Sequence, residues 1–196
     1  MTALPLDGRN ALVLGVERPA GRHAAVALAE AGANVAVVTI SEDTKAEFAA
    51  NSTANEFWAL GRKGVALTSD GHATTVQEAI AAATAQLGSI SVLVWHLPEP
   101  LPRETLAGLR SDPAIVVLIG DDDAPDEARA LLEWTRALSD AGLRANALLA
   151  SRAVADAASP AIKEHHAPEP LDLARATVYL ASDASAAIEG AVLVVS

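Results

Sequence analysis

The chain has 196 residues, a formal net charge of −11 and no cysteine. This length is enough for one domain with a sizeable core, so we expect residues 1–196 to form a single domain. The lack of cysteine excludes disulfides, thiolate catalysis and cysteine metal sites. The 14 basic residues are scattered, so we expect no nucleic-acid partner.

The apolar residues follow no pattern of secretion or membrane insertion. No run approaches the ~18 apolar residues that a membrane span requires. The first ten residues, M-T-A-L-P-L-D-G-R-N, do not have the pattern of a signal peptide. We therefore expect a cytoplasmic protein with no membrane partner.

Apolar runs alternate with helical patterns along the chain, and the 51% of hydrophobic residues include few aromatic ones. This alternation predicts an α/β fold with a three-layer, Rossmann-like, doubly wound parallel sheet of about six or seven strands and helices on both faces. In the second helix, Phe48 and Trp58 are the expected core anchors. The predicted elements, in chain order, are a strand over 11–14, a helix over 19–31, a strand over 34–40, a helix over 45–61, a strand over 64–68, a helix over 75–87, a strand over 90–94, a short helix over 106–109, a strand over 114–119, a helix over 125–141, a strand over 143–149, a helix over 171–182 and a strand over 191–195.

A glycine-containing loop joins the first strand to the first helix and reads L-G-V-E-R-P-A-G over residues 14–21. A loop in this position commonly holds a nucleotide phosphate at the N-terminus of the helix. Gly15 and Gly21 are in place. Pro19, which has no N–H and adds bulk, stands where a third glycine would allow close approach to a phosphate.

Several segments together resemble the short-chain dehydrogenases/reductases. They read L-D-G-R-N-A-L-V-L-G at 6–15, A-V-A-L-A-E-A-G-A-N-V-A-V-V at 25–38, A-T-A-Q-L-G-S-I-S-V-L-V at 83–94, L-E-W-T-R-A-L at 132–138 with G-L-R-A-N-A-L at 142–148, and V-Y-L-A-S-D-A-S-A-A-I-E-G-A-V-L-V-V at 178–195. The resemblance covers nearly the whole chain. It implies a fold that, in active members of about 250 residues, serves NAD(P)-dependent oxidoreductases.

The chain departs from this family where the cofactor would bind. The family loop is T-G-x-x-x-G-x-G, and here Pro19 replaces its middle glycine while Glu17 adds a negative charge. Arg18 matches an arginine of NADPH-using relatives. At the end of the second strand, Thr39 and Ile40 stand in place of the acidic residue that binds the ribose of NAD. We therefore expect no cofactor, with NADP or NAD the choice if any binds. The residues of a weak, vestigial cofactor site would be Gly15, Arg18 and Gly21.

The chain also departs from the family's catalytic residues, so we expect none in this protein. The family uses a Tyr-x-x-x-Lys pair, and alignment places Ala124 and Ala128 at those positions. The only tyrosine is Tyr179. The serine position falls in Gly120-Asp121-Asp122-Asp123, and the family's N-N-A-G is replaced by Trp95-His96-Leu97-Pro98, in which we expect Trp95 to fill space. The only lysines are Lys45, Lys63 and Lys163.

A further departure is the connection between the fourth and fifth strands. The family carries a long helix there, whereas residues 97–113 of this chain contain prolines at 98, 100 and 102. We therefore expect this crossover helix to be shortened.

Three other groups of residues are candidate sites, and none predicts a metal site. The acidic run D-D-D-A-P-D-E at 121–127 is better explained as the first turn of a helix, where carboxylates complement the helix dipole. Glu164-His165-His166 lacks the spacing of a metal site and fits an exposed loop. His96 is a weak candidate for a general base.

An intact framework without catalytic residues favours a non-catalytic subunit, a pseudoenzyme that assembles with an active short-chain dehydrogenase/reductase in a hetero-oligomer, or with itself. The resemblance implies subunit contacts through the helix over 125–141, with Leu131, Trp134 and Leu138, and through the strand over 191–195. One alternative is a divergent oxidoreductase that uses His96 or an aspartate, with NADP held by Arg18. Another is a sensor of a nucleotide or acyl ligand in the old cleft.

Overall fold

The computed structural model describes residues 3–41, 43–96, 105, 106, 109, 115–121, 125–150 and 171–195. Within these ranges seven strands form one sheet in the order β3-β2-β1-β4-β5-β6-β7, and each pair is parallel. The strands are β1 (Asn10–Leu14), β2 (Asn34–Thr39), β3 (Gly64–Thr68), β4 (Val92–Trp95), β5 (Ile115–Asp121), β6 (Arg144–Ala150) and β7 (Val192–Val195). The helices are α1 (Pro19–Glu30), α2 (Thr44–Ala59), α3 (Ala73–Leu87), α4 (Pro125–Asp140), α6 (Leu171–Ala181) and the 3-10 turn η2 (Asp183–Ser185). This confirms the predicted doubly wound sheet.

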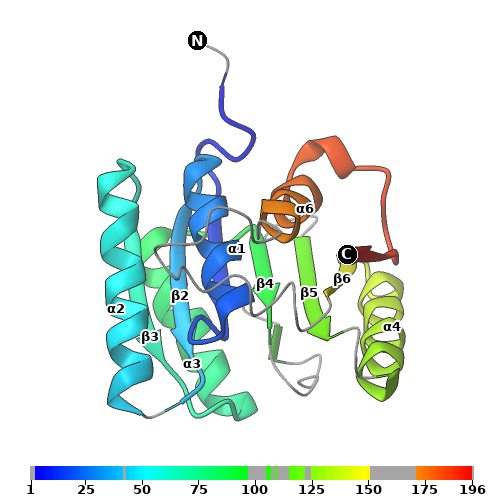
Figure 1. Ribbon diagram of the computed structural model, residues 1–196, viewed down its shortest axis with the longest axis horizontal. Coiled ribbons are helices and arrows are strands. Elements are labelled where there is room, and N and C mark those ends of the chain that lie inside the picture. Colours follow the sequence, from blue (N-terminus) through cyan, green and yellow to red (C-terminus); the bar gives the residue numbers. More distant parts are fainter. Residues whose placement is uncertain are drawn as a thin grey trace, which may run out of the picture.

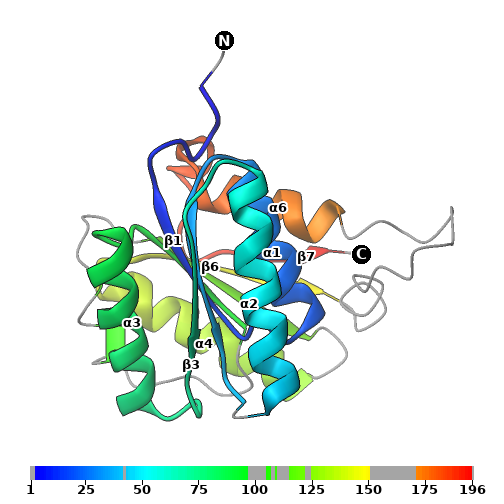
Figure 2. The ribbon, with the colours of Figure 1, turned by 90° about the vertical axis from the view of Figure 1, so that its left-hand side faces the viewer.

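Helices cover both faces of the sheet and form a three-layer structure. Figures 1 and 2 show α1, α2 and α6 on one face and α3 and α4 on the other. Each face has its own hydrophobic cluster, built mainly from alanine, valine and leucine as the composition predicts. The central strands are buried on both sides, which explains why they are nearly continuous apolar runs in the sequence.

The two predicted anchors of α2 are wrong. Phe48 and Trp58 are 74% and 68% exposed, whereas Phe57 is fully buried. The helix starts at Thr44, after the Asp43 side chain accepts a hydrogen bond from the backbone N–H of Lys45 at 3.2 Å. In that helical phase, Phe57 lies on the buried face and Trp58, one residue on, points away from it.

Parts of two predicted segments lie outside the described residues. In the connection over 97–113, Thr105 and Leu106 are buried, and the backbone N–H of Leu109 donates to the carbonyl of Leu106 at 2.9 Å; the expected shortening of its helix lies outside the described residues. Residues 151–170, which include Glu164, His165 and His166, are not among the described residues. None of the helices in the described ranges is long and apolar enough to cross a bilayer.

Candidate functional site

The candidate site lies at the carboxyl ends of β1 and β4. The chain leaves β1 toward β2 on one side and β4 lies on the other side, so the strand order reverses between them. Doubly wound sheets bind ligands in the crevice at this point. Leu14 pairs with Trp95 at the strand ends, and the N–H of His96 donates to the carbonyl of Leu14 at 3.1 Å. The structure thus brings the loop over 14–21 and His96 together.

Both glycines of the loop are required by close packing. Gly15 has φ of +85°, and a Cβ on it would lie 2.2 Å from the carbonyl oxygen of His96. A Cβ on Gly21 would lie 2.3 Å from the carbonyl oxygen of Gly15 and 3.5 Å from Nδ1 of His96. The loop, the start of α1 and the end of β4 therefore meet at backbone distance, and this packing explains both glycines without a ligand.

The start of α1 offers few hydrogen-bond donors to an anion. Pro19 is at the first position of the helix, which suits its fixed φ but supplies no N–H. Arg18 is the N-cap residue without a capping side chain, and its own N–H donates to the carbonyl of Gly15 at 3.2 Å. Its side chain is partly exposed, and no contact within the described ranges uses its guanidinium.

A carboxylate occupies the end of β2. Oε2 of Glu17 accepts a hydrogen bond from the backbone N–H of Ile40 at 3.3 Å. Thr39 is fully buried, and its hydroxyl accepts from the N–H of Ser41 at 3.3 Å. The carboxylate at this point therefore comes from the loop after β1. In the pattern that the resemblance implies, it would come from β2 and would face a ribose.

An aromatic pair fills the space after β4. Trp95 is 1% exposed, and its ring meets that of Trp134 from α4 edge to face, with centroids 4.7 Å apart. This geometry is the favourable one for aromatic rings. It places Trp95 as the sequence predicts, in the core. The indole N–H of Trp95 is buried and has no hydrogen-bond partner among the described residues.

The end of β5 is covered by α4. A Cβ on Gly120 would lie 1.9 Å from Cδ1 of Leu131, so any side chain there would collide with this leucine. Leu131 and Leu138 are 9% and 1% exposed, and Trp134 packs against the same hydrophobic cluster. The expectation that these residues contact another subunit is therefore wrong for Leu131 and Leu138, which are buried, whereas Trp134 is only partly buried. They form the core on their own face of the sheet, because the apolar stripe of α4 faces inward.

The other sequence candidates are not assembled into a site. Tyr179 lies on α6, 42% exposed, and Asp183, four residues later, forms an ion pair with Arg9. Asp122, Asp123 and Ala124 of the acidic run over 121–127 lie outside the described residues, and α4 begins at Pro125 as predicted. The part of the chain that the structure describes contains no cluster of three or more His, Cys, Asp or Glu side chains suited to a metal ion.

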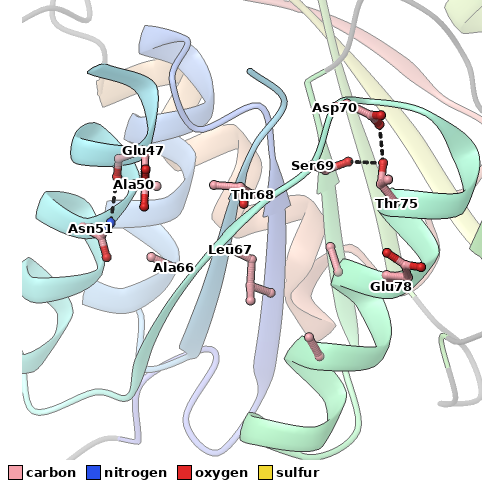
Figure 3. Close-up of a pocket in the computed structure, with 12 residues that line it drawn as sticks. Glu47, Ala50, Asn51, Ala66, Leu67, Thr68, Ser69, Asp70, Thr75 and Glu78 are labelled. Carbon is pink, nitrogen blue, oxygen red and sulfur yellow. Dashed lines mark hydrogen bonds between the residues drawn. The ribbon is translucent and has the colours of Figure 1, made fainter. Parts of the chain in front are cut away.

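The sequence analysis missed a pocket on the free side of β3. This cavity of about 480 Å³ lies between α2 and α3, and its walls include Glu47, Asp70 and Glu78 (Figure 3). The one feature of the sequence that indicates it is the polar residue Thr68 at the end of the strand over 64–68. Only the strand order, however, shows that β3 is at the edge of the sheet.

Comparison with known proteins supports the family resemblance at the level of the fold. A blue fluorescent protein from a metagenomic library, solved with NADPH, is 22% identical, with a TM-score of 0.77 over 97% of both chains. A short-chain dehydrogenase from Burkholderia cenocepacia, solved with NADP, is 20% identical, with a TM-score of 0.74 over 97% of both chains. The chain has the short-chain dehydrogenase/reductase fold.

Two further matches agree with this fold. A short-chain type dehydrogenase/reductase from Mycobacterium marinum is 20% identical, with a TM-score of 0.75 over 100% of this chain and 97% of that one. In sequence, the chain is 34% identical over 94 residues to 2-dehydro-3-deoxy-D-gluconate 5-dehydrogenase from Dickeya dadantii. That match covers 45% of this chain and 33% of the relative. No family model matches the chain.

Proposed function

We propose that this protein is a non-catalytic member of the short-chain dehydrogenases/reductases that assembles with, and supports, an active relative. The observation that carries the proposal is the contact between Leu131 and Gly120. Because Cδ1 of Leu131 lies where a side chain on Gly120 would start, the end of β5 could hold the family's serine only if this leucine shifted. The chain also has no Tyr-x-x-x-Lys sequence.

The loop residues do not fit a dinucleotide in the way that the resemblance implies. Pro19 supplies no N–H to a pyrophosphate, and the Glu17 carboxylate, which is bonded to the N–H of Ile40, adds a negative charge beside the loop. The remaining glycines are accounted for by packing against His96 and against each other. Arg18 is the one residue of the loop that favours NADP. The similar structures that contain NADPH or NADP are different proteins, and we propose that this chain has lost such binding.

The proposed subunit contact is the edge of the sheet at β7. Val194 is 59% exposed and Tyr179, on the neighbouring α6, is 42% exposed. β7 pairs only with β6 among the described strands, so its other edge is open to a partner. The helix α4 is less suited to this role, because Leu131 and Leu138 are buried and Arg129, Glu133 and Arg136 are exposed.

Calorimetric titration with NADPH and NADH tests the loss of cofactor. We expect no heat of binding with either nucleotide. Tight binding that disappears in Arg18→Ala would instead support a divergent NADP-dependent oxidoreductase. That second candidate is favoured by one observation, the position of the His96 imidazole against Gly21. Activity lost in His96→Ala but not in His72→Ala would establish it.

Co-expression with a full-length short-chain dehydrogenase/reductase encoded beside it tests the assembly. We expect the two chains to copurify, and Val194→Asp to separate them. Phe48→Asp is the matched control, because Phe48 is equally apolar and 74% exposed but lies on α2, far along the sheet order from β7. Separate elution of the wild-type chains would contradict the proposal.

A further inference from the structure

The sheet edge at β3 combines an open strand with a groove. β3 pairs only with β2 within the described part of the chain, and the cavity of about 480 Å³ runs beside it. Figure 3 shows α2 and α3 on opposite sides of the strand, with Glu47 on one wall and Glu78 on the other. The lining residues are Glu47, Ala50, Asn51, Ala66, Leu67, Thr68, Ser69, Asp70, Thr75, Glu78, Ala79 and Ala82.

The backbone of β3 presents hydrogen-bonding groups to this groove. The carbonyl of Lys63 accepts from Val35, and the N–H of Ser69 donates to Thr39, so the odd-numbered residues bond β2. In a parallel ladder the alternate residues point their N–H and C=O groups the other way. Ala66 and Thr68 therefore direct these groups outward, and no hydrogen bond of the described residues uses them.

Residues of α2 and α3 form the two walls of the groove. On α2, Glu47, Ala50 and Asn51 follow the spacing of a single helical face, and small side chains line the base of both walls. On α3, Thr75 and Glu78 do the same. Such an edge, flanked by two walls, is the geometry that binds a peptide as an added strand.

The negative charge of the groove favours a basic occupant. Its three ionisable lining residues are Glu47, Asp70 and Glu78, and none is basic. Asp70 is held in place by hydrogen bonds from the Thr75 hydroxyl and the N–H of His72, and these lower the pKa of its carboxyl, so it is ionised at neutral pH. A second copy of this chain, with a net charge of −11, would be repelled.

We propose that the edge of β3, between α2 and α3, binds an extended lysine- or arginine-rich segment of another protein as an eighth strand. The main chain of the segment bonds Ala66 and Thr68, and its basic side chains face Glu47 and Glu78. The site is independent of the proposed function, because β3 and β7 lie at opposite edges of the sheet. If no peptide binds at β3, the proposed subunit contact at β7 is not affected.

Fluorescence anisotropy with synthetic peptides tests this inference. The probe alternates lysine with valine, and two control peptides carry glutamate in place of lysine or N-methyl groups on the backbone amides. We expect only the probe to bind, and its affinity to fall with added salt. Equal binding of the glutamate or N-methylated peptide, or no binding of the probe at about 1 mM, would overturn the inference.

Two variants locate the binding. The double variant Glu47→Lys with Glu78→Lys should weaken the probe by about tenfold, since each exposed charge pair contributes a few-fold. The matched control is Glu133→Lys, on the exposed face of α4, which should bind as the wild type does. Thr68→Pro removes an outward N–H while sparing the bonds to β2, and it should abolish binding with a near-native unfolding temperature. Unchanged affinity in the double variant, or self-association of the wild type that Thr68→Pro removes, would contradict the proposal.

Discussion

Cδ1 of Leu131 on α4 lies where a side chain of Gly120 at the end of β5 would have to lie, 1.9 Å from the position of its Cβ. Gly120→Ala should therefore destabilise the protein by about 1–3 kcal/mol through overpacking. Leu131→Ala alone should cost about 2–5 kcal/mol, because it leaves a cavity. In the double variant the new methyl group enters that cavity, so the total loss should be smaller than the sum. Urea unfolding of the four proteins measures this coupling, and strictly additive losses would contradict the contact.

The framework could be predicted because its signals are local. Buried parallel strands are continuous apolar runs, and both ends of each predicted strand therefore lie within two residues of the observed ends. The roles of individual apolar residues could not be predicted as well. Leu131, Trp134 and Leu138 form an apolar stripe that is the same for a helix facing its own sheet and for one facing another subunit. Only the packing against Trp95 and Gly120 distinguishes the two.

The sequence predicts which family residues the candidate site lacks, but it does not predict the contacts that the remaining residues make. The positions of the single tyrosine and the three lysines in the sequence show that the tyrosine and lysine pair is absent. That the Glu17 carboxylate reaches Ile40 depends on how the loop folds over the sheet, which no local pattern reveals. The groove beside β3 likewise depends on which strand is at the edge.

Adjacent aromatic residues on α2 should respond very differently to truncation. Phe57 is fully buried, so Phe57→Ala should cost about 3–5 kcal/mol of stability. Trp58 is 68% exposed, so Trp58→Ala should change stability by less than about 0.5 kcal/mol. Chemical unfolding of both variants provides the comparison, with each serving as the other's control. A larger loss in Trp58→Ala would mean that α2 has a different helical phase.

The guanidinium of Arg144 ties β6 to the end of α6. Arg144 is 7% exposed, and its Nη2 donates hydrogen bonds to the carbonyls of Leu180 at 3.3 Å and Ser182 at 2.9 Å. Burial lowers its pKa. Arg144→Leu removes both guanidinium hydrogen bonds and leaves the Ser185 hydroxyl as the remaining side-chain donor to these carbonyls, so it should cost about 1–3 kcal/mol. Arg129→Leu, on the exposed face of α4, should fall within about 0.5 kcal/mol of the wild type by thermal unfolding. Equal effects would refute the anchoring role.

His23 should make stability depend on pH. Burial, followed by the nearby charge of Arg22, lowers the pKa of its imidazole below 6.5. The unfolded chain therefore takes up a proton first as the pH falls, so the contribution of His23 is complete above pH 6.5 and is lost as the pH falls through the folded pKa. Because the side chain is only half-buried, the loss should be small compared with that of a fully buried histidine. Unfolding of the wild type and His23→Gln at about pH 8 and about pH 5 measures it. A wild-type protein that gains stability relative to the variant at the lower pH would reverse the sign.

Native mass spectrometry of the protein isolated from its own cells tests the central claim most directly. We expect a mixed assembly in which this chain accompanies a full-length short-chain dehydrogenase/reductase, and no bound dinucleotide on this chain when the two are separated by collision. A monomer or an assembly of this chain alone, carrying NADP or NAD, would contradict the account.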